Sequence, residues 1–220
     1  MLNLIKYRQR GDTLIEVLFA VSVFSLVAIG GLTIMNQGSN TTQRALEITL
    51  VRQQIDAQAE GLRFLHDAYI ASYRPGATYS TDVPAGQQAI AQWAKMDTDI
   101  KATNSSAASP FGNFDSCPET PPLGSFIINT RTATFANTSV AKYKKASVYS
   151  RVNYSEQNGQ VLIDSTEGLW IEAVRSAPST DTANQSNIGF IDFHIRACWD
   201  SVGQVVPMTI GTIVRLYEPR

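Results

Sequence analysis

The sequence contains few cysteines, few histidines and few charged residues. Its 220 residues include two cysteines, two histidines and 17% Asp, Glu, Lys and Arg, whereas charged residues make up about 25% of an average globular chain. Two cysteines cannot supply a four-ligand zinc site, and the histidines, His66 and His194, are far apart in the chain. A formal net charge of −1 excludes nucleic-acid binding through overall basicity. The 44% of hydrophobic residues are enough for a core and exclude an intrinsically disordered chain.

The motifs that would indicate an enzyme are also missing. The sequence has no Gly-x-Ser-x-Gly, no His-Glu-x-x-His and no phosphate-binding loop. Asp97-Thr98-Asp99 matches the start of a calcium-binding loop but lacks the glycine and the final glutamate of that motif, so we interpret it as a solvated acidic turn. We therefore predict a protein that is not an enzyme and that holds no metal and no other cofactor.

Apolar residues are concentrated near the N-terminus. Leu14–Met35 is a run of 22 residues with a single charge, Glu16. As an α-helix, this run would be about 33 Å long, close to the thickness of the hydrocarbon core of a bilayer. Before Gly11 the only charged residues are Lys6, Arg8 and Arg10. Because a basic flank stays in the cytoplasm, we expect one membrane span over residues 12–35 with the following residues outside.

Glu16 is a carboxylate in an otherwise apolar segment. Such a group costs about 2–3 kcal/mol at the bilayer centre and less near its edge, so it indicates a function and a cationic partner. Cleavage between Gly11 and Asp12 would create a free α-amino group four residues before Glu16, and this positive charge is a suitable partner. The alternatives are an uncleaved signal anchor and a secretory signal cut near Gly30, which both leave Glu16 without a role.

This N-terminal pattern resembles the class III signal of type IV pilins and pseudopilins. The basic leader, Gly11, the segment Thr13-Leu14-Ile15-Glu16-Val17 and the long apolar run match the family pattern Lys/Arg-Gly-Phe-Thr-Leu-Ile-Glu from residue 6 to residue 35. The resemblance implies that a prepilin peptidase cuts after Gly11 and methylates the amine of Asp12. It also implies that Glu16 pairs with the amine of a neighbouring subunit. Asp12 stands where phenylalanine is usual, and its carboxylate would compete with Glu16 for the amine.

The residues after the apolar run predict an α+β fold. Apolar residues recur at steps of three and four between Ile48 and Tyr73, so we expect residues 36–73 to extend the membrane helix as an amphipathic helix. A shorter helical pattern covers 84–101, and a loop rich in Ser, Thr, Asn and Pro covers 103–124. The expected strands are 125–130, 146–154, 160–164, 169–175, 188–199 and 205–217, with a hairpin turn at Asn158-Gly159. The apolar face of the long helix would pack on an antiparallel sheet, as in pilins, and residues 74–220 would form a β-rich domain outside the cytoplasm.

The two cysteines lie in different parts of this domain. Cys117 falls in the predicted loop, and Cys198 falls in a predicted strand, opposite its apolar face. Outside the cytoplasm, oxidising conditions allow a disulfide between them, and many members of the family that the N-terminus resembles contain a disulfide near the C-terminus. The alternative is a pair of buried free thiols. We favour the disulfide, which would attach the loop to the sheet.

A basic and aromatic cluster lies near the middle of the domain. It contains Lys142, Lys144, Lys145 and Arg151, with Tyr143 and Tyr149 between them. Lysines contact phosphates and aromatic rings stack on bases, so the cluster is a candidate nucleic-acid patch. The alternative is the solvated end of a strand. We favour the second interpretation, because without its leader the chain has 15 Lys and Arg against 19 Asp and Glu, a net charge of −4 that disfavours a broad DNA-binding surface.

Together these features predict a prepilin that becomes a minor pilin. It would enter the cytoplasmic membrane as a single span, be cut by prepilin peptidase, and assemble with other pilin subunits through its N-terminal helix into an extracellular filament. One alternative is a pseudopilin of a type II secretion or competence system. An alternative from another class is a membrane-anchored or secreted binding domain that forms no filament.

Overall fold

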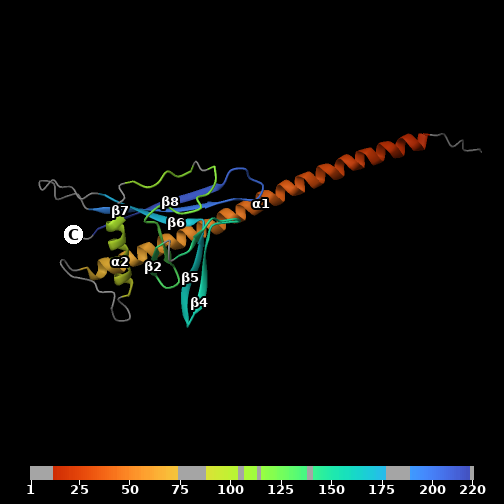
Figure 1. Ribbon diagram of the computed structural model, residues 1–220. Helices are drawn as coiled ribbons and strands as arrows, with labels where there is room; N and C mark the ends of the chain where they lie inside the picture. The colour runs from red at the N-terminus through yellow and green to blue at the C-terminus, as the bar shows by residue number, and fades with distance from the viewer. Residues whose placement is uncertain are drawn as a thin grey trace, which may run out of the picture. The chain divides into compact units, whose positions relative to one another are not determined.

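The computed structural model describes residues 12–73, 88–103, 107–112, 115–137, 141–176 and 189–218 (Figure 1). These residues form two helices and eight strands: α1 (Asp12–Ser72), α2 (Gln88–Thr103), β1 (Phe126–Asn129), β2 (Thr134–Asn137), β3 (Tyr143–Lys144), β4 (Arg151–Gln157), β5 (Gln160–Glu167), β6 (Leu169–Arg175), β7 (Phe190–Trp199) and β8 (Met208–Tyr217). The chain comprises two compact units, Met1–Ala45 and Leu46–Arg220, and α1 contributes to both. The predicted α+β fold with a long N-terminal helix is confirmed.

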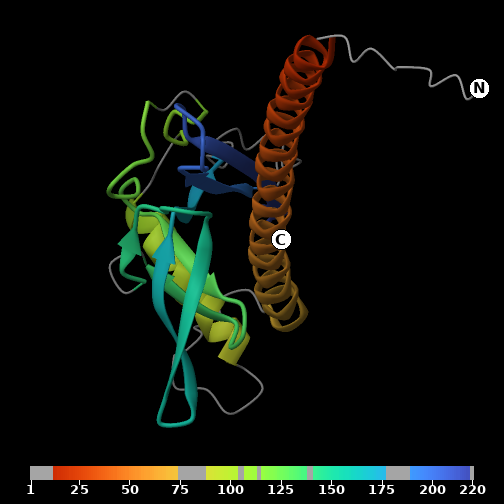
Figure 2. The same cartoon turned by 90° about the vertical axis from the view of Figure 1, so that its right-hand side faces the viewer.

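The strands of the second unit form two sheets. The larger is antiparallel and has the order β2-β1-β6-β7-β8. The smaller has the order β3-β5-β4, in which β4 and β5 are antiparallel and β3 runs parallel to β5. The β4–β5 hairpin extends away from the larger sheet (Figure 2). The sequence pattern indicated neither β2 nor β3, because strands of four and two residues are too short to show alternation.

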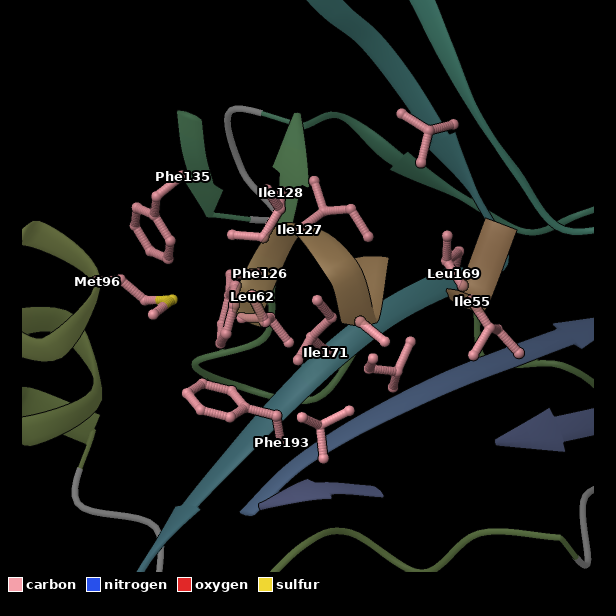
Figure 3. Packing of buried hydrophobic residues seen from close by; sticks show 14 of the residues in the cluster. Ile55, Leu62, Met96, Phe126, Ile127, Ile128, Phe135, Leu169, Ile171 and Phe193 are labelled. Carbon is pink, nitrogen blue, oxygen red and sulfur yellow. The ribbon is translucent and has the colours of Figure 1, made fainter. Parts of the chain in front are cut away.

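The core lies between the larger sheet and the two helices. The predicted apolar stripe of α1 is buried from Val51 to Leu65, and Figure 3 shows its members Ile55 and Leu62 among side chains of the sheet. Met96 of α2 points into the same cluster, and the Trp93 ring meets the ring of Phe193 edge to face at 6.0 Å. Both helices therefore cover the same face of the sheet.

Helix α1 approaches strand β1 closely at two neighbouring positions. A Cβ atom at Gly61 would lie only 3.1 Å from a methyl carbon of Ile128, so a glycine permits this contact. One turn earlier, the fully buried Gln58 side chain donates to the carbonyl of Ile128 and accepts from its amide, both at 2.9 Å. Strand β6 pairs with β1 at Phe126. Gln58 thus supplies the hydrogen bonds that a neighbouring strand would give to Ile128.

The ends of two predicted strands differ from the structure. Strand β4 begins at Arg151 instead of residue 146, and Val148, which precedes it, is half exposed. Ala146 forms only an isolated bridge to Trp199, because the chain bends between Ala146 and the start of β4. Strand β8 begins at Met208, directly after Pro207, which has no backbone N–H for a ladder.

The predicted hairpin turn is confirmed. Asn158 and Gly159 have φ angles of 52° and 74°, and they connect the paired residues Gln157 and Gln160. These left-handed conformations match the two-residue turn that an Asn-Gly pair favours. By contrast, Asp97-Thr98-Asp99 lies within α2 and not in an acidic turn, and Asp97 is paired with Lys101 and Arg175.

Candidate functional site

The predicted processing site lies where α1 begins. Lys6, Arg8, Arg10 and Gly11 are outside the described residues. Asp12, which cleavage after Gly11 would make the first residue, is the first residue of α1. Glu16 lies one turn further along the helix with an exposed side chain, and no described residue is hydrogen-bonded to it or paired with it. The backbone thus places the predicted new amine and the carboxylate on the same helix, four residues apart.

The apolar segment of α1 presents its side chains outward on all sides. Its large hydrophobic residues between Leu14 and Met35 are 43–73% exposed within the chain. Their polar neighbours Ser22, Ser25 and Thr33 donate to the carbonyl groups four residues before them at 2.7–2.9 Å, so these hydroxyls are satisfied inside the helix. Within the described residues, α1 is the only helix that is long and apolar enough to cross a membrane. This segment therefore presents an apolar surface that no described residue covers.

A second candidate site is the loop that covers the outer face of the larger sheet, opposite the helices. Cys117 of this loop forms a disulfide with Cys198 of β7, so the favoured pairing is confirmed. The two Cα atoms are 5.6 Å apart and both residues are buried. Trp170 of β6 is buried beside the disulfide, between the rings of Phe111 and Tyr143 at 6.1 Å each.

A buried ion pair lies under the same loop. Arg196 of β7 and Glu172 of β6 are 2.7 Å apart, and both are less than a tenth exposed. Trp170 and the backbone N–H of Ser109 also donate to the Glu172 carboxylate, while Arg196 donates to the carbonyl of Ser109. Sequence alternation placed Arg196 and Cys198 on the polar side of β7. They are buried because residues 107–112 and 115–118 cover that side, which alternation within one strand cannot show.

Protonation of Glu172 in this cluster and of His194 on β7 should make the fold less stable in acid. Burial opposes ionisation of Glu172, but hydrogen bonds from Ser109 and Trp170 and the charge of Arg196 outweigh it, so the Glu172 pKa lies below its usual value. The His194 pKa is also lowered, by burial and by Arg196. For both groups the folded chain favours the deprotonated form. Their stabilisation is therefore present above the unfolded pKa and is lost as the pH falls through the folded pKa.

We accordingly expect the free energy of unfolding to fall in two stages on acidification. The first begins below about pH 6.5 from His194, and the second begins below about pH 4.3 from Glu172. Urea unfolding at a series of pH values measures both. In a His194→Gln variant the first stage should be much reduced while the second remains. An unfolding midpoint that is constant between pH 7 and pH 5 in the unmodified chain would contradict the role given to His194.

Loss of the disulfide should also destabilise the second unit. The bond joins positions 81 residues apart, for which chain entropy predicts a contribution of about 4 kcal/mol. A Cys117→Ser variant should unfold at lower temperature and lower urea concentration than the unmodified chain. A reducing agent should lower the stability of the unmodified chain and leave the variant unchanged. Equal melting of the unmodified chain with and without the reductant would contradict this prediction.

Two of the four basic residues of the candidate nucleic-acid patch are paired with carboxylates. Lys145 is paired with Asp200 at 3.0 Å, and Arg151 is paired with Glu167 at 3.1 Å. Arg151 also lies over the ring of Tyr149. Lys142 and Lys144 are exposed. Two of the four positive charges are thus already compensated, which weakens the attraction to phosphates that a nucleic-acid patch needs.

The aromatic member between these lysines is also engaged. The Tyr143 hydroxyl donates to the carbonyl of Pro118, and burial, with a smaller effect of Glu119, raises its pKa. Its ring is half-buried against Trp170 and is not presented to a base. The geometry therefore fits the end of a strand that supports the disulfide-linked loop.

An open groove of about 750 Å³ was not indicated by the sequence. It lies between α1, the start of α2 and the turn after β1, and it is lined by Ala57, Glu60, Gly61, Phe64, Gln88, Ala89, Thr130, Arg131, Thr132 and Ala133. Its lining has no histidine or cysteine, and its carboxylate Glu60 is paired with Arg63. Among the residues that the structure describes, no group of three or more His, Cys, Asp or Glu side chains could hold a metal ion.

Comparison with protein-family models, with curated proteins and with solved structures finds no match to this chain.

Proposed function

We propose that this chain is a prepilin-like subunit, most simply a minor pilin, that is cleaved after Gly11 and assembles through α1 into a filament. The observation that carries the proposal is the composition of this one helix. Its first part is an exposed apolar segment with a single charge at Glu16, and its last part packs on an antiparallel sheet. The first part suits assembly in an apolar environment, and the second part attaches a folded domain to it.

The chemistry of assembly would be non-covalent. Apolar side chains of the segment from Leu14 to Met35 first contact lipid and then the same segments of neighbouring subunits. Lipid is as apolar as these side chains, so packing and polar contacts decide the association. A carboxylate left unpaired among apolar helices is costly, and the amine of Asp12 from another subunit can neutralise Glu16. This pair would set how far one subunit is displaced along its neighbour.

The disulfide supports a location outside the cytoplasm for the second unit. Disulfides persist in oxidising compartments and are rare in the cytosol. The basic residues before Gly11 would remain on the cytoplasmic side, accessible to the peptidase.

A pseudopilin of a secretion or competence system would use the same helix and the same amine. A shear fraction separates the two, because a surface filament is released by shear and a short periplasmic filament is not.

The N-terminal peptide of the mature protein tests the proposal. Mass spectrometry of the membrane-bound protein, expressed with a prepilin peptidase, should find a chain that starts at Asp12, with or without a methyl group on its amine. A Gly11→Ala variant should keep Met1. A Gly30→Ala variant is the matched control, because a Cβ at that position would meet nothing within 4 Å apart from its chain neighbours and the backbone of its own helix, and it should be cleaved normally. A start near Gly31, or an intact Met1 in the unmodified chain, would favour a secreted or anchored binding domain.

A further inference from the structure

A small pocket lies at the end of the second unit where α1 ends and β7 begins (Figure 1). Its volume is about 170 Å³, and α1, α2, β6, β7 and β8 all contribute side chains to its lining. These side chains are scattered along the chain between residue 66 and residue 218, so no motif in the sequence indicated the pocket. Only the folded second unit brings them together.

Four charged side chains form a continuous series of ion pairs in the lining. Asp97 of α2 is paired with Lys101 at 2.6 Å and with Arg175 of β6 at 2.9 Å. The other terminal nitrogen of the Arg175 guanidinium is paired with Glu218, which follows β8. Two positive charges therefore cancel two negative charges, so this series attracts neither an anion nor a cation by its net charge.

The paired groups keep hydrogen-bonding capacity for a ligand. The side chains of Asp97 and Arg175 are about a fifth exposed, and that of Lys101 is more than half exposed. An ammonium has three donors, a guanidinium has five, and a carboxylate can accept about four hydrogen bonds. Donors and acceptors thus stand side by side without net charge. This arrangement suits hydroxyl groups, because each hydroxyl both donates and accepts.

Tyrosine rings form another part of the lining. Tyr69 and Tyr73 lie at the end of α1 and directly after it, with ring centroids 5.6 Å apart, and both are half-buried. Tyr217 of β8 is 54% exposed, and its carbonyl contacts the His66 ring at 2.8 Å. A tyrosine ring offers an apolar face beside a polar rim. The pocket can therefore contact C–H groups and hydroxyl groups of one ligand at the same time.

Other classes of ligand fit the lining less well. Both carboxylates, Asp97 and Glu218, are already paired with cations, and no metal-binding group occurs in the part of the chain that the structure describes. A wholly apolar ligand would remove water from the ion pairs without replacing its hydrogen bonds, which is costly. A ligand with a net charge would leave that charge unbalanced. A neutral ligand with several hydroxyl groups meets neither cost.

We propose that this pocket binds one pyranose unit of a neutral glycan. Hydroxyl groups on adjacent carbons would donate to the Asp97 carboxylate and accept from Lys101 or Arg175, while C–H groups of the sugar ring contact Tyr73. The pocket volume is close to that of one such ring with its substituents. This inference goes beyond the proposed function and does not rest on cleavage, membrane insertion or a filament, because every lining residue belongs to the second unit.

Saturation-transfer difference NMR of the full chain tests the site. The chain is held in dodecylphosphocholine micelles, because this detergent has no sugar headgroup. The probes are D-glucose, D-galactose, D-mannose and N-acetyl-D-glucosamine, with D-glucuronate and D-glucosamine as charged analogues. At least one neutral sugar should bind with a dissociation constant on the order of 1 mM, as expected for so small a ligand. The charged analogues should bind several-fold more weakly than that sugar.

Two substitutions on different elements locate the binding. Tyr73→Ala removes the ring contact, and Lys101→Ala removes a donor while the pair of Asp97 with Arg175 remains. Each should lower the affinity about tenfold. Tyr149→Ala is the matched control, because Tyr149 is also a half-buried tyrosine but lies outside the pocket. It should leave the affinity unchanged.

The outcomes are independent of the N-terminal peptide that tests the proposed function. A tenfold loss in both pocket variants, with Tyr149→Ala unchanged, supports the inference. The absence of saturation transfer to all four neutral sugars overturns it. Tighter binding of glucuronate or glucosamine than of any neutral sugar also overturns it, because the site would then select a charge. Sugar binding that is unchanged in both Tyr73→Ala and Lys101→Ala places the contact elsewhere and overturns the assignment to this pocket.

Discussion

Replacing Glu16 by leucine is expected to leave cleavage after Gly11 unchanged and to remove the subunit from filaments. In the proposed function, the peptidase would act at Gly11, five residues earlier, whereas the Glu16 carboxylate would be needed only when the amine of another subunit enters the apolar bundle. Removing one partner of a buried charge pair costs about 3–5 kcal/mol, which lowers incorporation by a factor on the order of 10²–10⁴. The amount of tagged subunit in purified filaments, relative to the membrane fraction, measures this effect.

A matched control for Glu16→Leu is available at the next position. Val17→Leu changes an exposed apolar side chain of the same segment into another apolar one, so it should reduce incorporation little. Glu16→Asp keeps the charge on a shorter side chain and should be intermediate. Unchanged incorporation of the Glu16→Leu variant would show that the carboxylate has no role in assembly, even if the N-terminal peptide starts at Asp12.

The largest loss of stability from a single substitution away from the disulfide should follow from Gln58→Met. Methionine has nearly the same volume, so the main change is the loss of both hydrogen bonds to Ile128. The amide and carbonyl of Ile128 are buried, and each unsatisfied group costs about 1–3 kcal/mol, so we expect a loss of about 2–5 kcal/mol. Urea unfolding of residues 36–220, which exclude the apolar segment, measures the difference.

Gln53→Met is the control for this substitution. Gln53 lies on the exposed side of the same helix, so its replacement should change the free energy of unfolding by no more than about 0.5 kcal/mol. If the Gln58→Met chain does not fold, hydrogen exchange on Gln58→Glu, which retains an acceptor for the Ile128 amide, reports the loss of the second bond. An unfolding midpoint of Gln58→Met equal to that of Gln53→Met would contradict the role of Gln58 as a substitute for a strand.

Two other glutamines also form hydrogen bonds to a strand backbone from a helix. Gln92 of α2 accepts from the backbone N–H of Phe135 in β2 at 3.0 Å, and Gln54 of α1 accepts from that of Val152 in β4 at 3.4 Å. Each satisfies a strand amide from a helix. In the sequence these glutamines are indistinguishable from exposed ones, because their partners are 43 to 98 residues away. Their function is visible only when helix and strand are placed together.

Features that depend on residues close together in the chain could be predicted from the sequence. The apolar segment with Glu16 and the basic residues before it are contiguous. The buried stripe of α1, the apolar side of β7 and the Asn158-Gly159 turn follow from periods of 3.6 and 2 and from turn conformation. Such patterns can be recognised without the structure because the apolar side chains of one element must be buried on the same side, whatever covers them.

The identity of the buried polar groups and of their partners could be seen only once the chain is folded. Glu47, Gln58, Glu172 and Arg196 all lie in the interior of the second unit, although residue type and alternation favour exposure for each of them. Their burial depends on segments far away in the chain, such as the loop that Cys117 attaches to Cys198 and the β7–β8 loop beside α1. The physical reason is that a buried polar group is stable only with its partner in place, and that partner is brought by folding rather than by sequence proximity.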